Sequence, residues 1–231
     1  MANTAIFIAM LGGVLPALLW LAFWLLEDRC QPEPKRFILF SFFGGMMALF
    51  VALQLERFAM DYLSIAAGTG AFALMVGVVE EGSKFLLAYL VALRWSVFDE
   101  PLDGIIYMVT VALGFSALEN ALFLYTPLMH GEILRTIVTG DMRFIGATLL
   151  HTLSSAAIGI ALALSYSKPA AIRRMAVLGG LILAISLHTM FDFLIMTKGD
   201  VTFWVFLITW LGIIAALLMV ERVKQPARDY C

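Results

Sequence analysis

Residues 77–85 read Gly-Val-Val-Glu-Glu-Gly-Ser-Lys-Phe and place two adjacent carboxylates and a lysine inside a long apolar run. The apolar run continues for several residues on both sides. A charged side chain near the centre of a membrane helix costs about 2.5–3.5 kcal/mol on insertion scales. Because three such residues occur within five positions, we expect Glu80, Glu81 and Lys84 to belong to a functional site.

The composition is that of a membrane protein. Of the 231 residues, 62% are hydrophobic and 14% are charged, whereas soluble domains have about 45–50% apolar and about 25% charged residues. We therefore predict an all-α fold, a polytopic transmembrane helical bundle, with residues 1–231 forming a single integral membrane domain. Its catalytic helices are expected at about residues 71–196. The net charge of −2 gives no basic surface, so nucleic acid is not expected as a partner.

Seven apolar segments are long enough to cross a bilayer, which takes about 20 mostly apolar residues. We predict about seven spans, and up to eight, at about residues 4–26, 37–57, 71–94, 103–125, 144–166, 175–196 and 201–220. Residues 58–70 are expected to form an interfacial stretch. Residues 127–143 are expected to form the longest loop.

Basic residues orient the predicted bundle. Ten fall in the loops after the first, third and fifth spans and in the C-terminal tail: Arg29, Lys35, Arg36, Arg94, Lys168, Arg173, Arg174, Arg222, Lys224 and Arg228. Four fall at the other ends of the spans: Arg57, Arg135, Arg143 and Lys198. Because cytoplasmic loops carry an excess of Lys and Arg, this distribution predicts the N-terminus outside and the C-terminus inside.

The two cysteines and the N-terminus fit this topology. Cys30 and Cys231 are too few for a zinc site built from thiolates. The predicted topology places both in the cytoplasm, where they should stay reduced. The first residues contain no Lys or Arg, whereas a secretory signal peptide begins with a basic region. The first apolar run is therefore expected to be a retained membrane helix.

Ionisable residues in the span interiors are confined to the third to sixth spans, and the first, second and seventh have none. The polar set is Glu80, Glu81, Lys84, Glu119, Asn120, His151, His188 and Asp192. Four of them lie 13–16 residues from the cytoplasmic ends of their spans, one in each span: Glu81, Glu119, His151 and His188. That separation corresponds to about 20–24 Å at the rise of an α-helix. The shared depth, in the outer half of the bilayer, predicts a single site.

Spacing within the helices indicates pairs. His188 and Asp192 are four residues apart and share a helix face, as do Glu80 and Lys84, while Glu81 and Lys84 are three apart. Adjacent carboxylates point in different directions, so we expect Glu81 to face the site and Glu80 to pair with Lys84. A purely structural alternative is that Glu80 and Lys84 form an ion pair within their helix and that each histidine makes a hydrogen bond between helices. A purely structural core would, however, bury an excess of carboxylates with one lysine to neutralise them.

Carboxylates and histidines that meet in a dry site suit the activation of water. A buried carboxylate can act as a general base, and histidines can bind a divalent metal or stabilise an oxyanion. The sequence has no Gly-x-Ser-x-Gly, Gly-x-Gly-Asp or His-Glu-x-x-His motif. This disfavours serine, presenilin-type and site-two-type intramembrane proteases.

Four groups of residues resemble the motifs of the PrsW family of bacterial intramembrane proteases: Glu80-Glu81-x-x-Lys84, Phe115-x-x-x-Glu119 with Asn120, His151 followed by Gly159, and His188-x-x-x-Asp192. Segments 33–35 and 103–107 also look like that family, so the resemblance covers about residues 28–195. The family is similar to the CAAX prenyl endopeptidases of the ABI superfamily. Those enzymes carry Arg in place of Lys84 and His in place of Glu119, and both differences favour PrsW.

The resemblance implies an intramembrane endopeptidase of the bacterial cytoplasmic membrane. Its substrate would be a membrane-anchored protein such as an anti-sigma factor, with membrane lipid as the other partner. The implied catalytic residues are Glu80, Glu81, Glu119, His151, His188 and Asp192, supported by Lys84, Asn120 and Phe115. The implied cofactor is a divalent metal, Zn²⁺ above others, with Glu119, His151, His188 and Asp192 as ligands. A glutamate protease without an obligatory metal stays open.

Three alternatives remain. A proton- or metal-coupled transporter also uses intramembrane Glu, His and Asp, but the sequence shows no inverted repeat and no pair of proline-broken helices. A CAAX-type prenyl-protein endopeptidase shares part of the motif set. A receptor or scaffold without catalytic activity would not need the full polar set.

Overall fold

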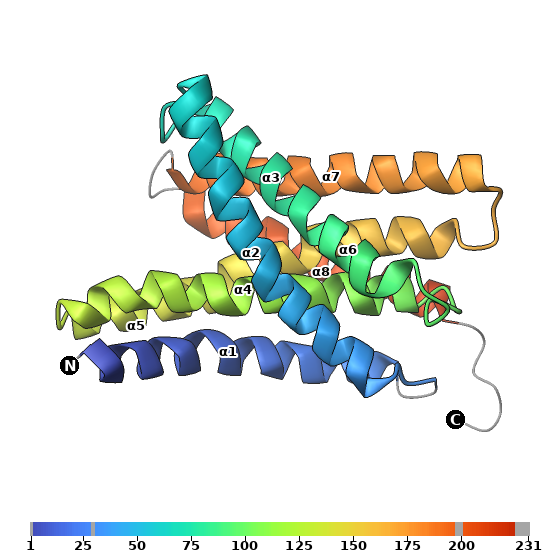
Figure 1. Ribbon diagram of the computed structural model, residues 1–231, viewed down its shortest axis with the longest axis horizontal. Coiled ribbons are helices and arrows are strands. Elements are labelled where there is room, and N and C mark those ends of the chain that lie inside the picture. The colour runs from blue at the N-terminus through green and yellow to red at the C-terminus, as the bar shows by residue number, and fades with distance from the viewer. Residues whose placement is uncertain (1, 29–30, 197–200, 225–231) are drawn as a thin grey trace.

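The computed structural model is a helical bundle, and it describes residues 2–28, 31–196 and 201–224 (Figure 1). No strand occurs in these ranges. The helices are α1 (Ala2–Glu27), α2 (Lys35–Leu63), α3 (Gly70–Ala88), α4 (Asp103–Met129), α5 (Ile133–Met142), α6 (Thr148–Leu164), α7 (Ala170–Met196) and α8 (Thr202–Val223), with π-helical turns η1 (Tyr89–Leu93) and η2 (Arg143–Ala147). The residues that lie outside the described ranges include Cys30, Cys231, Arg29, Lys198 and Arg228.

Six helical segments are long and apolar enough to cross a membrane: Ala2–Leu26, Lys35–Leu63, Asp103–Met129, Ile133–Leu164, Ala170–Met196 and Thr202–Val223. The predicted all-α, multi-pass fold is therefore confirmed. The remaining predicted span is the third, at about residues 71–94, and it corresponds to α3, whose 19 residues include Glu80, Glu81 and Lys84. The number of spans and their orientation stay predictions. In Figure 1, α1 begins at one end of the bundle and α8 ends at the other.

Two predicted connections differ from the structure. Most of the loop expected at residues 127–143 is helix α5, which η2 joins to α6 with no break. Only the turn at residues 130–132 separates α4 from α5, and Gly131 has the positive φ of 70° that this turn needs. The prediction is wrong because the charges of Arg135, Asp141 and Arg143 resemble those of a loop, although apolar residues recur between them at helical spacing. The stretch expected at 58–70 begins as helix, since α2 continues to Leu63.

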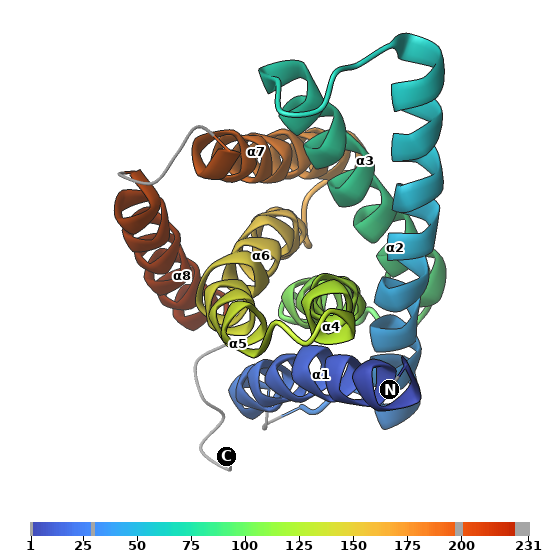
Figure 2. The ribbon, with the colours of Figure 1, turned by 90° about the vertical axis from the view of Figure 1, so that its left-hand side faces the viewer.

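Helix α4 is the core of the bundle (Figure 2). Within the described residues, 83% of an 18-residue apolar stretch of α4 is buried inside the bundle, whereas the share is 22% for the corresponding stretches of α1 and α7. It packs most extensively against α1, α2 and α6. A Cβ atom on Gly114 would overlap the carbonyl group of Phe42, so the backbones of α4 and α2 touch. This close contact fixes the helix that carries Glu119 and Asn120.

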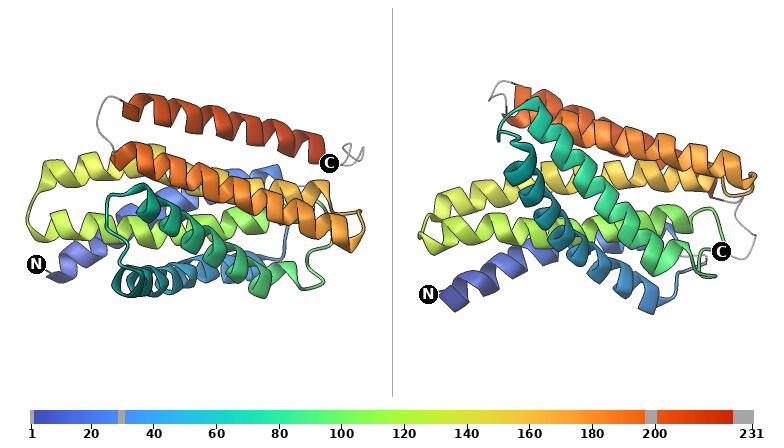
Figure 3. Two further views of the ribbon diagram at one scale, coloured as in Figure 1. Left: turned by 90° about the horizontal axis from the view of Figure 1, so that it is seen from above. Right: turned by 45° about the horizontal axis from the view of Figure 1, so that its top comes forward.

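Helices α2 and α3 cross the others obliquely, and α8 lies on the outer side of α7 and α6 (Figure 3). Thr69 caps the start of α3 by accepting the N–H of Phe72 at 3.2 Å. Further along, α3 packs against α7 at Gly77, where a Cβ atom would lie 2.7 Å from Thr189 Oγ1. The small residue lets α3 approach closely, which brings Glu80 and Glu81 beside the helix that carries His188.

Candidate active site

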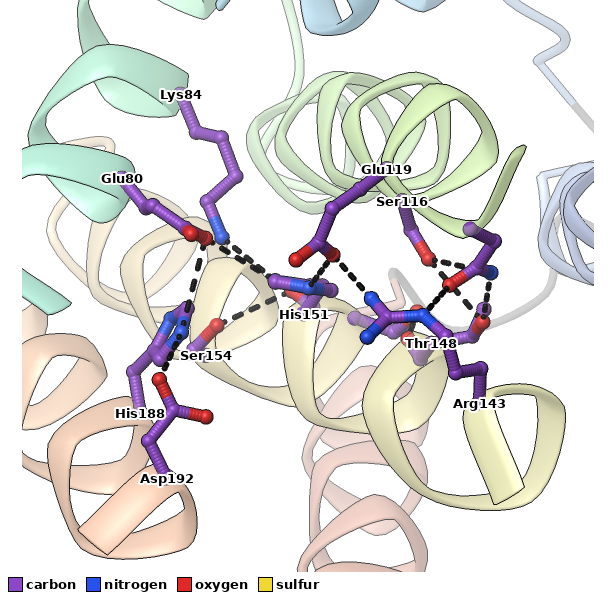
Figure 4. A network of polar contacts seen from close by, with 12 residues as sticks. Glu80, Lys84, Ser116, Glu119, Arg143, Thr148, His151, Ser154, His188 and Asp192 are labelled. Carbon is purple, nitrogen blue, oxygen red and sulfur yellow. Dashed lines mark hydrogen bonds and ion pairs between the residues drawn. The ribbon is translucent and has the colours of Figure 1, made fainter. Parts of the chain in front are cut away.

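The structure brings together all six predicted catalytic residues, from α3, α4, α6 and α7 (Figure 4). A cavity of about 840 Å³ lies beside them. Five of the six are Glu80, Glu119, His151, His188 and Asp192, which all line this cavity. The sixth, Glu81, lies behind Glu80 and is fully buried. The shared depth deduced from the sequence therefore corresponds to a real convergence of side chains.

Glu81 and Lys84 form a completely buried ion pair. Lys84 Nζ donates to Glu81 Oε1 at 2.6 Å, and both side chains are 0% exposed. The same oxygen accepts hydrogen bonds from Ser154 Oγ at 2.8 Å and from His188 Nδ1 at 2.7 Å. Lys84 also lies 4.8 Å above the ring centre of Phe115. Glu81 is thus an anchor that three donors hold in place.

Glu80, not Glu81, faces the cavity. Its Oε2 is buried, has no hydrogen-bond partner, and lies 3.6 Å from His188 Nε2 and 3.8 Å from His151 Nδ1. The expected division of roles, with Glu81 at the site and Glu80 paired with Lys84, is therefore wrong in its geometry. Both spacings fit one helix face, and the position of α7 decides between them.

The two imidazoles are oriented by carboxylates behind them. His188 Nδ1 meets Glu81, so the hydrogen-bond network assigns it the proton and leaves the Nε2 lone pair toward Glu80. His151 Nε2 lies 2.8 Å from Glu119 Oε2, and its Nδ1 lies 3.0 Å from Lys84 Nζ. The same reasoning assigns the His151 proton to Nε2. The two rings meet edge to face, with centres 5.2 Å apart.

Glu119 is held by an arginine that the sequence analysis placed in a loop. Arg143 Nη2 donates to Glu119 Oε2 at 2.5 Å, and Arg143 Nε donates to Asn120 Oδ1 at 2.5 Å. Asn120 in turn donates to Thr148 Oγ1 at 2.9 Å and to Ser116 Oγ at 3.2 Å. One signal for Arg143 was present in the sequence, because it lies eight residues before His151, about two helical turns away on the same face.

Three side chains offer ligand atoms that lie within 4.8 Å of one another and could hold a metal ion: Glu80, His151 and His188. This set differs from the predicted one, in which Glu119 and Asp192 joined the histidines. Glu119 is occupied by Arg143 and His151, and Asp192 Oδ2 lies 3.4 Å from His188 Nε2. One carboxylate and two imidazoles are donors that Zn²⁺ accepts, and the unpartnered Glu80 Oε2 suits that use.

Glu56 is a cavity residue that was not among those predicted from the sequence. It lies on α2, lines the cavity, and has a buried Oε1 without a hydrogen-bond partner. The second span was predicted to end at residue 57, so its interior was thought to lack ionisable residues. Because α2 runs on to Leu63, Glu56 lies two turns before the helix end and can reach the cavity.

Comparisons with known proteins identify the family to which this chain is similar. Residues 33–219 match the model of a family described as PrsW family intramembrane metalloprotease. A protein named Protease PrsW from Geobacillus kaustophilus is 28% identical over 94% of this chain and 92% of its own length. One of the same name from Shouchella clausii is 26% identical over 94% of this chain and 96% of its own. Another, from Bacillus subtilis, is 31% identical over 49% of this chain and 52% of its own. No solved structure matches.

Proposed function

This chain belongs to the PrsW family of intramembrane metalloproteases, and we propose that it cleaves a membrane-anchored protein near the outer end of the substrate's membrane helix. The observation that carries the proposal is Glu80, a buried carboxylate whose Oε2 has no hydrogen-bond partner and faces two oriented imidazoles in a cavity. A carboxylate in that setting is suited to accept a proton from water.

In the proposed reaction Glu80 Oε2 takes a proton from a water molecule in the cavity. The water oxygen bonds to the carbonyl carbon of the scissile peptide, the C–N bond breaks, and Glu80 returns the proton to the leaving amine nitrogen. His188 is held ready by Glu81 and His151 by Glu119, so neither ring needs to reorient during the reaction. Lys84 keeps Glu81 ionised and so holds His188 in one tautomer.

A divalent metal, with Zn²⁺ as our first choice, would be held by Glu80, His151 and His188. Bound there, it would supply a water of lowered pKa and polarise the scissile carbonyl. If Glu80 were a metal ligand, another carboxylate would have to accept the proton from water. Asp192 would take that role, because it lines the same cavity and its Oδ2 lies 3.4 Å from His188 Nε2. The ligation of His151 would require Lys84 to give up its contact with His151 Nδ1.

The position of the cavity supports cleavage toward the outer face. Its lining includes the end of α7 at Met196, the start of α8 at Thr202, and Arg135 of α5. The positive-inside distribution assigns these ends to the outside. We accordingly place the protein in the bacterial cytoplasmic membrane as one domain over residues 1–231, with the N-terminus outside. Anti-sigma factors, which are anchored in that membrane, are the substrate class we propose.

The protease proposal is tested with purified protein in liposomes that also carry a single-span membrane protein as substrate. Wild-type protein is expected to cleave it, and Glu80→Gln to leave it intact. Asp141→Asn, which changes an exposed carboxylate on α5, is the matched control and should cleave as wild type does. Cleavage by pure Glu80→Gln protein would reject the proposed base. Proton or metal-ion flux through wild-type liposomes, without cleavage, would favour a transporter instead.

The metal proposal is tested by measuring zinc in the purified protein. Wild-type protein is expected to hold close to one zinc ion per chain, and His188→Ala to lose it. The control is His130→Ala, because His130 is the third histidine of the chain and is exposed outside the site. Equal zinc in the two variants, or no zinc in active wild-type protein, would exclude this site as the metal centre.

A further inference from the structure

Glu56 presents an acidic group to the cavity from α2, a helix that carries none of the other site residues. It shares one face of α2 with Leu49 and Leu53, which also line the cavity and precede it by seven and three residues, the spacing of one helix face. Glu56 as a whole is half-buried, but its Oε1 is fully enclosed. The carboxylate therefore points into the cavity rather than toward lipid.

Every other carboxylate around the cavity has a side-chain nitrogen atom within 4 Å. Glu81 is paired with Lys84, Glu119 with Arg143, and Asp192 with His188. Glu80 lies near both imidazoles. Within the described part of the chain, Glu56 has no ion pair, and its Oε1 has no hydrogen-bond donor. Among the described cavity carboxylates, Glu56 is the one with no side-chain nitrogen within ion-pair distance.

The charges nearest to Glu56 make the mismatch larger. Glu80, Glu119 and Asp192 are within electrostatic range of it, with His188 as the one group of opposite tendency. The two arginines of the lining are already engaged, Arg143 by Glu119 and Asn120, and Arg135 by Glu132 at 2.9 Å near the exposed rim. A ligand that carries a positive charge would relieve this excess, whereas an acidic ligand would increase it.

We propose that Glu56 is a specificity-determining residue that binds the side-chain cation of a lysine or arginine in the substrate, close to the scissile bond. The inference rests on the proposed protease function, because it assigns the cavity to a substrate polypeptide. The cavity of about 840 Å³ has room for several side chains. Glu56 and Glu80 line this same cavity, so a cation held at Glu56 belongs to a substrate residue close to the cleaved bond.

The test uses single-span model substrates whose outer juxtamembrane segment consists of Gly, Ala and Ser with one lysine. The lysine is moved through successive positions, and each substrate has a twin with glutamine at that position. At the best position, wild-type protein should prefer lysine by about 30-fold or more in kcat/KM, as expected when one partner of a desolvated charge pair is removed. In Glu56→Gln protein this ratio should fall toward one.

Two further variants sharpen the result. Glu56→Lys is expected to reverse the preference, so that a substrate with glutamate at the best position exceeds its lysine twin. Asp61→Asn is the matched control, because Asp61 lies on the same helix five residues further on, is exposed, and is outside the cavity lining. It should keep the wild-type ratio.

A binding measurement separates recognition from turnover. In a Glu80→Gln background, the lysine substrate labelled with a fluorophore should bind more tightly than its glutamine twin, and adding Glu56→Gln should remove the difference. Equal binding of the twins, an unchanged ratio in Glu56→Gln, or a drop in kcat that is equal for both twins would overturn the inference. In those cases wild-type cleavage would still stand. Failure of wild-type protein to cleave any substrate would instead overturn the proposed function, and the binding arm would still decide on Glu56.

Discussion

Buried carboxylates gather at two levels along α4, around Glu119 beside the cavity and around Asp103 at its first residue. At the cavity, charged partners are supplied by Lys84 and Arg143 within 2.6 Å of Glu81 and Glu119. At the start of α4 no Lys or Arg of the described chain pairs with the buried carboxylates. Buried carboxylates are therefore accommodated differently at the two levels, with a basic partner at the cavity and without one at the start of α4.

The cluster at the start of α4 consists of Asp28, Glu33, Asp103 and Tyr107, all buried. Tyr107 donates its hydroxyl hydrogen to Glu33, and Asp28 Oδ2 accepts the N–H of Glu33 at 3.2 Å. Asp103 Oδ2 accepts the N–H groups of Asp99 and Glu100, each at 2.8 Å. Burial raises the pKa of Glu33 to about 9 and that of Asp28 to about 6. At neutral pH Glu33 therefore keeps its proton, and a proton rather than a basic side chain neutralises it.

The difference shows what a group of acids in a membrane protein can mean. Fixed cations keep carboxylates ionised, and an ionised carboxylate beside a cavity can accept protons or bind cations. A carboxyl group that keeps its proton, as Glu33 does, acts as a hydrogen-bonding group and joins the loop at residues 31–34 to the start of α4. The first arrangement suits chemistry, and the second suits structure.

The largest effect is expected when one carboxylate is removed from each level and cleavage is measured. Glu80→Gln should lower kcat by about 10²–10⁴-fold, the usual contribution of a general acid or base. Glu33→Gln should stay within about threefold of wild type, because glutamine replaces a carboxyl that is already neutral at pH 7. Comparable losses in the two variants would mean that the distinction between chemical and structural carboxylates is wrong.

A second test removes the cation that keeps Glu81 ionised. Lys84→Met leaves Glu81 buried without its charged partner and should lower the free energy of unfolding by about 3 kcal/mol or more. Replacing both residues with methionine should recover most of that loss, since an apolar pair of similar volume is often neutral. Unfolding is followed by denaturation in detergent. A double variant as unstable as Lys84→Met alone would show that the loss is not caused by an unpaired charge.

The third test changes the pH to release the proton that folded protein holds on Glu33. Between pH 7 and pH 8, folded protein holds the Glu33 proton because its pKa is raised to about 9, whereas the unfolded chain has released it near 4.5. The folded state binds more protons, so stability falls as pH rises, by up to about 1.4 kcal/mol per pH unit. Glu33→Gln should flatten this slope. Equal slopes of melting temperature against pH in both proteins would refute the assignment.

The smallest expected effect comes from the phenol. Tyr107→Phe removes the donor to Glu33 and should cost about 0.5–1.5 kcal/mol of stability, with little change in cleavage. Tyr89→Phe, which alters a tyrosine that is 48% exposed, serves as the comparison and should be close to neutral. If Tyr107→Phe abolished cleavage while the protein stayed folded, the cluster at the start of α4 would have a part in the reaction.

Much of the site could be predicted from the sequence because burying charge in a membrane is costly. That cost singled out Glu80, Glu81, Glu119, His151 and His188, and counting along the helices gave a common depth for the last four. The orientation of Glu80 and Glu81 could not be predicted, since both flanking faces of α3 are apolar and only the neighbouring helices distinguish them. The glycine at position 77, which admits α7, makes that choice in the structure.

Two other site residues were hidden by helix boundaries. Arg143 belongs to η2, a wide turn between α5 and α6, and its charge was more easily assigned to a loop than to a helix interior. Glu56 precedes Arg57 and Asp61, which together suggested the end of a span, although α2 continues past them. Polar residues near a membrane boundary are ambiguous in sequence, because the same pattern fits a helix end and the rim of a cavity.

The π-helical turn at Arg143–Ala147 makes the number of residues in this segment important for the geometry of the site. Such a turn contains one residue more than an α-helical turn, so deleting a single residue there would restore regular α-helix and rotate everything before it by about 100°. Arg143 would then leave Glu119, and the exposed apolar residues Ile133 and Leu134 would turn away from their present surroundings. We expect a one-residue deletion in η2 to impair cleavage more than one in the turn at residues 130–132. Insertions and deletions, more than substitutions, would thus be restricted in this part of the protein.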